Sequence, residues 1–203
     1  DLKDELYTFN PVGGYFMTFN VNDITDPKVR EALSYAVDRE ALCQGVLFGT
    51  ATPNSRFLQD GLIGADDSVE QITYDPEKVK ELLTEAGYPD GYDLKITVNT
   101  SYPISLTIAT AVQAQMEEAG VHVEIEQVDA AAWSDMKKSG SITCNIGNWY
   151  VDYNDPDSML YPVSDGRTNL TSSFWHNDEF KQLMIDGIQT DDADERQEIY
   201  SRC

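Results

Sequence analysis

Two hydrophobic periodicities alternate along the chain, and together they predict an α/β fold. Apolar residues alternate with polar ones over 92–98 and again over 121–126, which is the pattern of half-buried β-strands. Between them, residues 104–119 place apolar side chains at helical spacing and end at Gly120. A strand, a helix and a strand of these lengths form a βαβ unit. We therefore expect two parallel strands with a right-handed crossover.

Further elements are predicted on both sides of this unit. Asp26-Pro27 and Asp75-Pro76 each combine an N-cap acid with a proline at the first helical position, and an apolar helical face follows both. Residues 50–73 are rich in Gly, Asp and Ser and are expected to form a long irregular excursion on the surface. The remaining expected elements are strands over 13–20 and through 142–146, and helices over 38–46, 130–138, 177–189 and from 192 onward.

The chain is strongly acidic, which narrows its partners. Its 203 residues hold 36 Asp and Glu against 14 Lys and Arg, giving a net charge of −22. Such a surface repels phosphate, which argues against nucleic acid and anionic lipid as partners. No run of 18 or more apolar residues occurs, so no segment is predicted to span a membrane. The chain opens without a secretory signal, and we expect it to be a piece of a longer protein.

The cysteines and histidines do not form a recognisable metal or disulfide pattern. Cys43, Cys144 and Cys203 are far apart and lack CxxC spacing. A Cys43–Cys144 disulfide stays open, but we expect both side chains to be buried thiols. His122 and His176 have no partner at metal-ligand spacing, and the alternation around His122 places it toward solvent. We expect no metal and no cofactor.

One short segment, residues 148–157 with the sequence NWYVDYNDPD, concentrates three aromatic rings and three acids. It follows the last predicted strand, and ligands of open α/β sheets bind beyond the carboxyl ends of strands. Asp152 stands next to Tyr153, with Trp149 three residues before it, and no Lys or Arg occurs between 138 and 167. A carboxylate walled by rings needs a cationic partner, because burying a lone charge is costly. A ligand ammonium would serve, aided by cation–π attraction.

Other roles for this segment remain open. As a calcium loop counted from Asp152 it fails at position 5, which is Pro156, and at position 12, which is Val163. A hydrolase could use Asp152 with Asp155 as paired carboxylates. However, Asp155 and Asp157 flank a proline, where acids are common turn residues. The rings could also belong to the core, and the chain has no Ser-His-Asp arrangement, GxGxxG or Walker loop.

Several motifs carry a resemblance to a known family. Asn20 with VREALSYAVDR at 29–39 resembles the signature “fN…vRxAlxyAxDR”, and YDPEKVKELLTEAGYPDG at 74–91 is similar to “yDPekAkeLLxeAGypdG”. Residues 149–156 resemble “WxxDYxdP”, and 177–183 and 194–200 resemble the late “n.eFdxLl” and “eRxxxY” helices. By these motifs the chain resembles the family 5 extracellular solute-binding proteins, the oligopeptide- and dipeptide-binding receptors of ABC importers.

The resemblance implies a fold and a setting. It implies a periplasmic-binding-protein-like (Venus-flytrap) lobe, an α/β fold with a mixed, mostly parallel sheet flanked by helices. Residues 1–203 would form the C-terminal lobe, with hinge or other-lobe segments at about 1–25 and 170–203. The expected protein is a monomeric receptor, not an enzyme, at the extracellular face of a bacterial membrane or in the periplasm, lipid-anchored at full length. It would capture extracellular peptides and deliver them to ABC permease subunits.

The resemblance also implies ligand-binding residues. The family's acid in “WxxDY” holds the α-ammonium of the peptide and corresponds to Asp152, and the tryptophan that lines the pocket corresponds to Trp149. Tyr150 lies in the segment whose backbone pairs with the extended ligand. Tyr153 completes the expected ring wall. Family members that carry nickel chelates or oligosaccharides provide the alternative cargo.

Overall fold

The computed structural model describes residues 11–66, 68–164 and 172–203, and these hold a four-stranded sheet. The strand order is β1 (Gly13–Phe19), β4 (Cys144–Tyr150), β2 (Tyr92–Asn99) and β3 (Val121–Val128). β2 pairs in parallel with both β3 and β4, whereas β1 pairs antiparallel with β4. The predicted parallel pair and the mixed, mostly parallel sheet are therefore confirmed.

The predicted helices are present with boundaries close to those expected. Asp26, Asp75 and Asp129 cap their helices by accepting backbone N–H bonds, as the cap-plus-proline signal indicates for the first two. One helix, α6, was not expected from the sequence. The helices are α1 (Pro27–Tyr35), α2 (Arg39–Ala41) continued by a π-helical turn (Leu42–Val46), α3 (Pro76–Glu85), α4 (Pro103–Glu118), α5 (Ala130–Ser139), α6 (Pro156–Ser164), α7 (Asp178–Gln189) and α8 (Ala193–Ser201).

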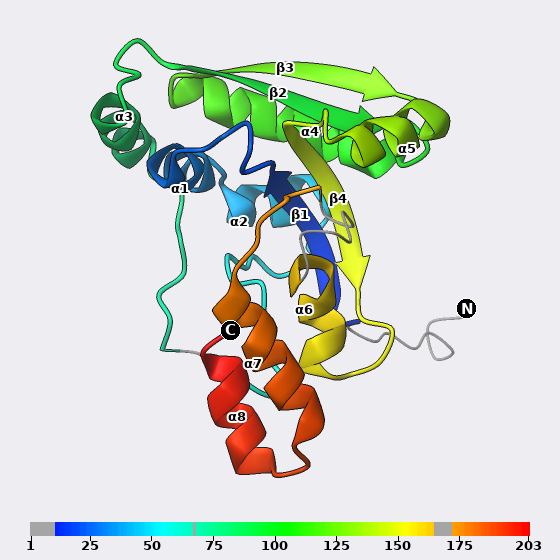
Figure 1. Ribbon diagram of the computed structural model, residues 1–203. Helices are drawn as coiled ribbons and strands as arrows, with labels where there is room; N and C mark the ends of the chain where they lie inside the picture. Colours follow the sequence, from blue (N-terminus) through cyan, green and yellow to red (C-terminus); the bar gives the residue numbers. More distant parts are fainter. Residues whose placement is uncertain (1–10, 67, 165–171) are drawn as a thin grey trace, which may run out of the picture.

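The main hydrophobic core lies where the helices cover the sheet. Figure 1 shows α4 running along β2 and β3, with α1 and α3 packed side by side at the edge of this region. Leu33 of α1, Ile96 of β2 and Met116 of α4 are each fully buried. Burying side chains of this kind stabilises a fold by about 1.5–3 kcal/mol apiece. Cys43 and Cys144 lie in this part of the fold as buried free thiols, as predicted. His122 is exposed on β3, also as predicted.

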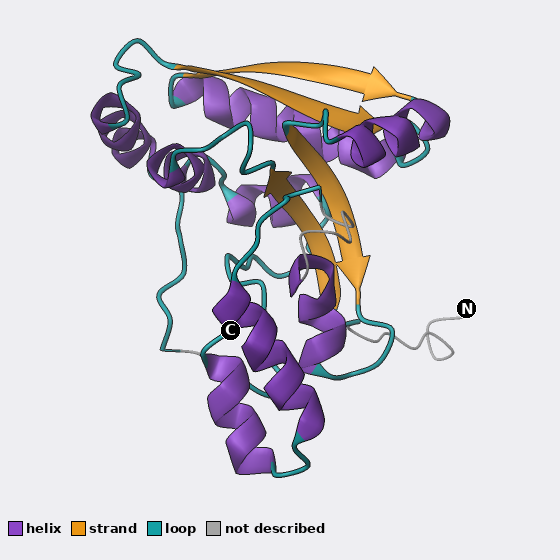
Figure 2. Cartoon of the chain, viewed as in Figure 1, coloured by secondary structure: helices purple, strands orange, loops and turns teal. Residues whose placement is uncertain are grey.

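A second, smaller hydrophobic cluster is built by α6, α7 and α8. The β1–β4 ribbon leads from the main core to this helical group (Figure 2). Its buried members are Leu160, Phe180, Met184 and Tyr200. Phe57, Leu58 and Ile63 pack against the same cluster. In the irregular segment, the described residues 50–66 and 68–73 form no helix or strand, as expected. The expectation that it is only a surface excursion is wrong, because its apolar side chains find a core there.

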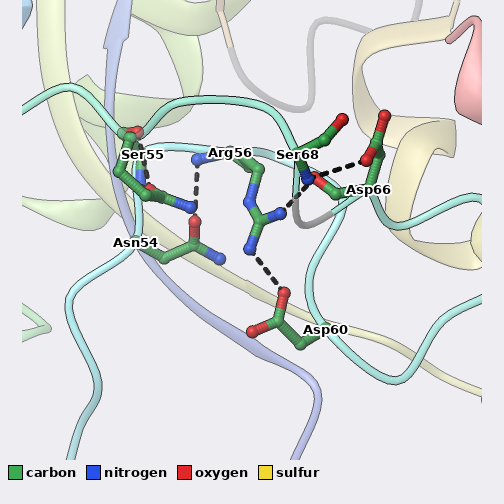
Figure 3. Close-up of polar contacts among 7 residues, drawn as sticks. Asn54, Ser55, Arg56, Asp60, Asp66 and Ser68 are labelled. Atoms are coloured by element: carbon green, nitrogen blue, oxygen red, sulfur yellow. Dashed lines mark hydrogen bonds and ion pairs between the residues drawn. The ribbon is translucent and has the colours of Figure 1, made fainter.

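Polar contacts give this irregular segment a defined shape (Figure 3). Arg56 donates from Nη2 to Asp60 Oδ1 at 2.6 Å and from Nη1 to the Asp66 carbonyl oxygen. The Arg56 backbone N–H in turn donates to Asn54 Oδ1 at 2.8 Å. Asp66 Oδ1 accepts from the Ser68 N–H at 2.8 Å. These bonds replace the backbone ladder that the segment lacks.

None of the helices in 11–66, 68–164 and 172–203 combines the length and the apolar character that crossing a bilayer requires.

Gly64 is where the irregular segment meets α8, and it yields a stability prediction. Its φ is +85°, and an added Cβ would lie 2.3 Å from Tyr200 Cβ and 2.6 Å from the Tyr200 carbonyl carbon. Because both the backbone strain and the overlap act against alanine, Gly64→Ala should lower the free energy of unfolding by about 2–4 kcal/mol in urea denaturation.

Gly61 provides the matched control for Gly64. Its φ is +89°, yet no heavy atom lies within 4 Å of an added Cβ. Gly61→Ala should therefore show only the backbone cost, about 1 kcal/mol. Equal losses in the two variants would contradict the close packing of Gly64 on α8.

Candidate functional site

The NWYVDYNDPD segment begins as a strand and ends as a helix. Asn148, Trp149 and Tyr150 close β4 opposite Tyr15, Gly14 and Gly13 of β1. The Val151 N–H continues the pairing by donating to the Val12 carbonyl oxygen at 3.0 Å. The expectation that the segment follows the last strand is wrong, because its first three residues belong to β4 and its last two to α6. The loop is residues 151–155, because β1 supplies a pairing partner before it and Pro156 starts α6 after it.

Ser158 of α6 fixes the start of this loop. Trp149 Nε1–H donates to the Ser158 carbonyl oxygen at 2.9 Å, and the Asp152 backbone N–H donates to Ser158 Oγ at 3.0 Å. Ser158 is 3% exposed, so both bonds are anchored in the interior. Trp149 is half-buried by this contact. These bonds fix the backbone at Asp152, while the Asp152 side chain faces solvent.

The carboxylate of Asp152 is exposed. Within the part of the chain that the structure describes, no hydrogen bond or ion pair reaches its oxygens. Tyr153 points its hydroxyl to Asp157 instead, donating to Oδ2 at 2.7 Å, and is 56% exposed. The expectation that rings wall Asp152 into a low-dielectric site is therefore wrong for this chain. Trp149 and Tyr153 are engaged elsewhere, which leaves the acid facing solvent.

Asp155 is an ion-paired residue as well as a turn residue. Its two carboxylate oxygens accept from Arg196 Nη2 at 2.7 and 2.8 Å. The turn role is confirmed, because its N–H donates to the Tyr153 carbonyl oxygen and its Oδ1 accepts from the Asp157 N–H at 3.3 Å. Burial alone would raise the pKa of Asp155. The hydrogen bonds from Arg196 and Asp157 outweigh it and hold the pKa below the ordinary value.

Tyr153 of the loop and Asp157 of α6 form a second pair of side chains, joined by a hydrogen bond. Burial is the largest cause of a raised pKa for the Asp157 carboxyl, and the neighbouring Asp155 adds to it. The hydrogen bond to Asp157 raises the pKa of Tyr153 to about 12. A pocket of ≈ 310 Å³ lies between this pair and the turn from α7 to α8, lined by Tyr153, Asp155, Asp157, Ile188, Thr190, Asp191 and Arg196. Asp152 is not part of its lining.

Tyr150 and Tyr15 lie on one face of the β1–β4 ribbon, next to the loop. They are 39% and 36% exposed, respectively. Burial, with Tyr15 close by, raises the pKa of the Tyr150 phenol. The predicted site residues Trp149 and Tyr150 thus lie at the end of β4 on its opposite faces, and Asp152 and Tyr153 lie in the loop that follows. Sequence reasoning did not single out Tyr15, Ser158 or Arg196.

The comparisons with known proteins identify the family. The profile of the bacterial extracellular solute-binding proteins, family 5 (middle region), matches residues 1–170. The chain belongs to this family. The match covers β4, the loop and the motifs at 20–39, 74–91 and 149–156, whereas the helical motifs at 177–183 and 194–200 lie beyond it.

Individual relatives agree with the family profile. The chain is 32% identical over its full length to heme-binding protein A of Haemophilus influenzae, of which it covers 39%. It is 29% identical to the dipeptide-binding protein of Escherichia coli over 93% of the chain and 37% of that protein. The structure of a dipeptide-binding protein from Pseudoalteromonas sp. SM9913 in complex with Met-Leu aligns with a TM-score of 0.84 and 25% identity. It covers 94% of this chain and 39% of that one.

These findings confirm the predicted fold class, a periplasmic-binding-protein-like lobe. The chain spans about two fifths of the length of the relatives it matches. The relatives are solute-binding proteins rather than enzymes. The hydrolase alternative rests on Asp152 and Asp155 as two paired carboxylates. Asp155 is instead paired with Arg196, so it is not available as the second free carboxylate.

In the described ranges, no group of three or more His, Cys, Asp or Glu side chains is placed so that it could hold a metal ion. The histidines contact single acids. His122 Nδ1 lies 3.3 Å from Glu117, and His176 Nε2 lies 2.9 Å from Asp178.

The lowered pKa of Asp155 predicts how stability depends on pH. An acid with a depressed pKa in the folded state stabilises above its ordinary value, here 3.8, and loses that contribution as the pH falls through the folded-state pKa. At pH 7, Asp155→Asn should lower the free energy of unfolding by about 1–2 kcal/mol, between exposed and buried pairs. The difference from the wild type should shrink below about pH 4 in urea titrations.

Asp152→Asn is the matched control, since it removes a carboxylate from the same loop that has no cationic partner among the described residues. It should change stability by less than about 0.5 kcal/mol at pH 7. A loss as large as that of Asp155→Asn would contradict the assignment of the ion pair.

Proposed function

We propose that this chain is the C-terminal lobe of a receptor that captures extracellular peptides through their free amino terminus and delivers them to an ABC importer. One observation carries the proposal. Of the three acids in residues 148–157, Asp155 and Asp157 already have partners, whereas the Asp152 carboxylate is exposed on a backbone fixed by Ser158. A fixed, unpaired charge at the carboxyl end of a strand is suited to a ligand cation.

The rest of the site supports an extended peptide. β4 pairs with β2 only at Cys144 and Asn145, while β1 covers its other edge. Over residues 146–150, the edge opposite β1 thus has no strand partner within the described residues, and its backbone groups can pair with an added strand. Trp149, Tyr150 and Tyr153 supply rings at the same end of β4. Closure of the other lobe over Asp152 would remove water and strengthen its pairing with an ammonium.

The larger setting is part of the same proposal. The two-lobed receptor would use segments near 1–25 and 170–203 as hinge or other-lobe connections, although residues 1–10 and 170–171 lie outside the described ranges. It would act as a monomer at the extracellular face of a bacterial membrane or in the periplasm, lipid-anchored at full length, and pass its cargo to permease subunits. The family and the named dipeptide-binding relatives support this reading.

A second candidate cargo comes from one comparison. The relative at 32% identity is named as a heme-binding protein. Heme carries two carboxylates, and a chain with a net charge of −22 repels such an anion more than a zwitterionic peptide. Nickel chelates and oligosaccharides have no feature of the described site in their favour, because neither offers the free amine that Asp152 would pair with. A titration of the receptor with heme, followed by its visible absorbance, separates this candidate from peptides.

The proposal predicts that Asp152 distinguishes a free amino terminus from a blocked one. In the full-length receptor that contains this chain, Asp152→Asn should weaken tri-alanine binding at least about tenfold, because a charge pair inside a closed cleft is lost. Binding of N-acetyl-tri-alanine should change little. Calorimetric titration of both peptides measures the difference.

Asp93→Asn is the control for charge. It removes an exposed acid at the second residue of β2, at the end of the strand opposite its carboxyl end. It should leave both affinities unchanged. Equal binding of tri-alanine to the wild type and to Asp152→Asn would rule out the proposed role of Asp152.

A further inference from the structure

We propose that Arg196 of α8 is a positioning residue for the ligand site: it holds the loop over 151–155 in the shape that presents Asp152. As far as ligand affinity is concerned, this inference rests on the proposed function. The loop geometry itself can be tested without any ligand.

The first observation is the contact between Arg196 and the loop. Arg196 Nη2 donates to both oxygens of Asp155, at 2.7 and 2.8 Å. The two side chains are only 18% and 25% exposed. Charge-assisted bonds of this length are stronger than neutral ones, and partial burial protects the pair from screening by salt. This contact ties the loop to a helix that is remote in the sequence.

The second observation is that Arg196 is itself held in place. Its Nε–H donates to the Gly187 carbonyl oxygen of α7 at 3.0 Å. Its guanidinium lies over the Tyr200 ring, 5.3 Å from the centroid, and Tyr200 is 1% exposed. Tyr200 comes close to α7 because residue 187 is glycine: an added Cβ there would lie 2.6 Å from Tyr200 Cζ. Arg196 is thus oriented by both helices before it meets Asp155.

The third observation is what Asp155 does inside the loop. Its side chain accepts the Asp157 N–H, and its own N–H donates to the Tyr153 carbonyl oxygen at 2.8 Å. Ser158 holds the loop at Asp152, and Arg196 holds it at Asp155. Tyr153 and Asn154 lie between these anchors and are exposed.

Removing Arg196 leaves Asp155 without its cation, in a stretch of six residues that holds three acids. Repulsion between Asp155 and Asp157 would then open the turn, and Asp152 would sample many orientations. A ligand would have to order the loop on binding, which lowers its affinity. Arg196 therefore acts through Asp155 on a residue that it does not touch.

Hydrogen exchange of the full-length receptor without ligand tests the loop geometry. In Arg196→Gln, amides over 151–158 should exchange at least about tenfold faster than in the wild type, because the turn bonds open more often. Arg196→Lys should lie between the two, since it keeps the charge but not the fork geometry. Amides of β2 should exchange as in the wild type.

Arg202→Gln is the matched control for this experiment. Arg202 lies directly after α8 and pairs with Glu179 of α7 at 3.1 Å, so the same substitution there breaks an α7–α8 contact without reaching the loop. Its loop exchange should be unchanged. If Arg196→Gln does not fold, Asp155→Asn removes the same pair from the other side and carries the same expectation. Loop exchange at the wild-type rate in the folded variant overturns the proposal.

The second readout is the ratio of the affinities for tri-alanine and N-acetyl-tri-alanine. Arg196→Gln should reduce this ratio at least about fivefold by weakening only the free-amine peptide, since a misplaced Asp152 loses its charge pair. Arg202→Gln should leave the ratio unchanged. A purely structural role of Arg196 would weaken both peptides equally and would overturn the proposal. A wild-type receptor that binds neither peptide overturns the proposed function instead, and the exchange experiment then decides the role of Arg196.

Discussion

The antiparallel pairing of β1 with β4 holds the two hydrophobic clusters together and sets the position of the loop. At one end of β4, Cys144 and Ile146 are buried in the main core, and β2 pairs alongside. At the other end, Trp149 and Tyr150 pair with Gly14 and Gly13 and lead into the loop. The ribbon thus connects the two hydrophobic clusters, and the carboxyl end of β4 extends beyond its pairing with β2. Gly13 allows the close approach, because a Cβ there would lie 2.4 Å from the Trp149 carbonyl oxygen.

The second cluster gives this strand end its surroundings. Tyr200 is central to it, because Gly64, Gly187 and Arg196 all contact it. The irregular segment over 55–64 reaches the same place, where the Gly64 N–H donates to Gln197 Oε1 at 2.9 Å and Gln59 accepts from the Gly13 N–H at 2.8 Å. Helices α7 and α8 are therefore joined to β1, to the irregular segment and to the loop over 151–155 at once. Under the proposed function, this gives the loop that presents Asp152 a rigid support.

The elements were predictable from the sequence where local signals decide them. The periodicity of 92–98 and 121–126 identified the parallel strands, and Asp-Pro pairs identified α1 and α3. The same Asp-Pro signal at 155–156 marks α6, but the acids there were interpreted only as turn residues. The candidate site was only partly predictable. Its location at the end of β4 was found, whereas the exposure of Asp152 and the pairing of Asp155 with Arg196 were not. The pairing of Asp155 with Arg196 joins residues that are remote in sequence, which no local pattern encodes. The exposure of Asp152 follows from contacts of Trp149 and Tyr153 with α6, a helix that the sequence analysis does not predict.

Under the proposed function, Asp152 receives the amino terminus of a peptide. A crystal structure of the full-length receptor with tri-alanine bound would show whether it does. We expect the peptide α-ammonium at about 2.7–2.9 Å from an Asp152 carboxylate oxygen, the distance of a charge-assisted hydrogen bond. We also expect peptide backbone paired along the edge of β4 opposite β1. A peptide whose ammonium is held elsewhere, with Asp152 still facing solvent in the closed receptor, would exclude this role of Asp152.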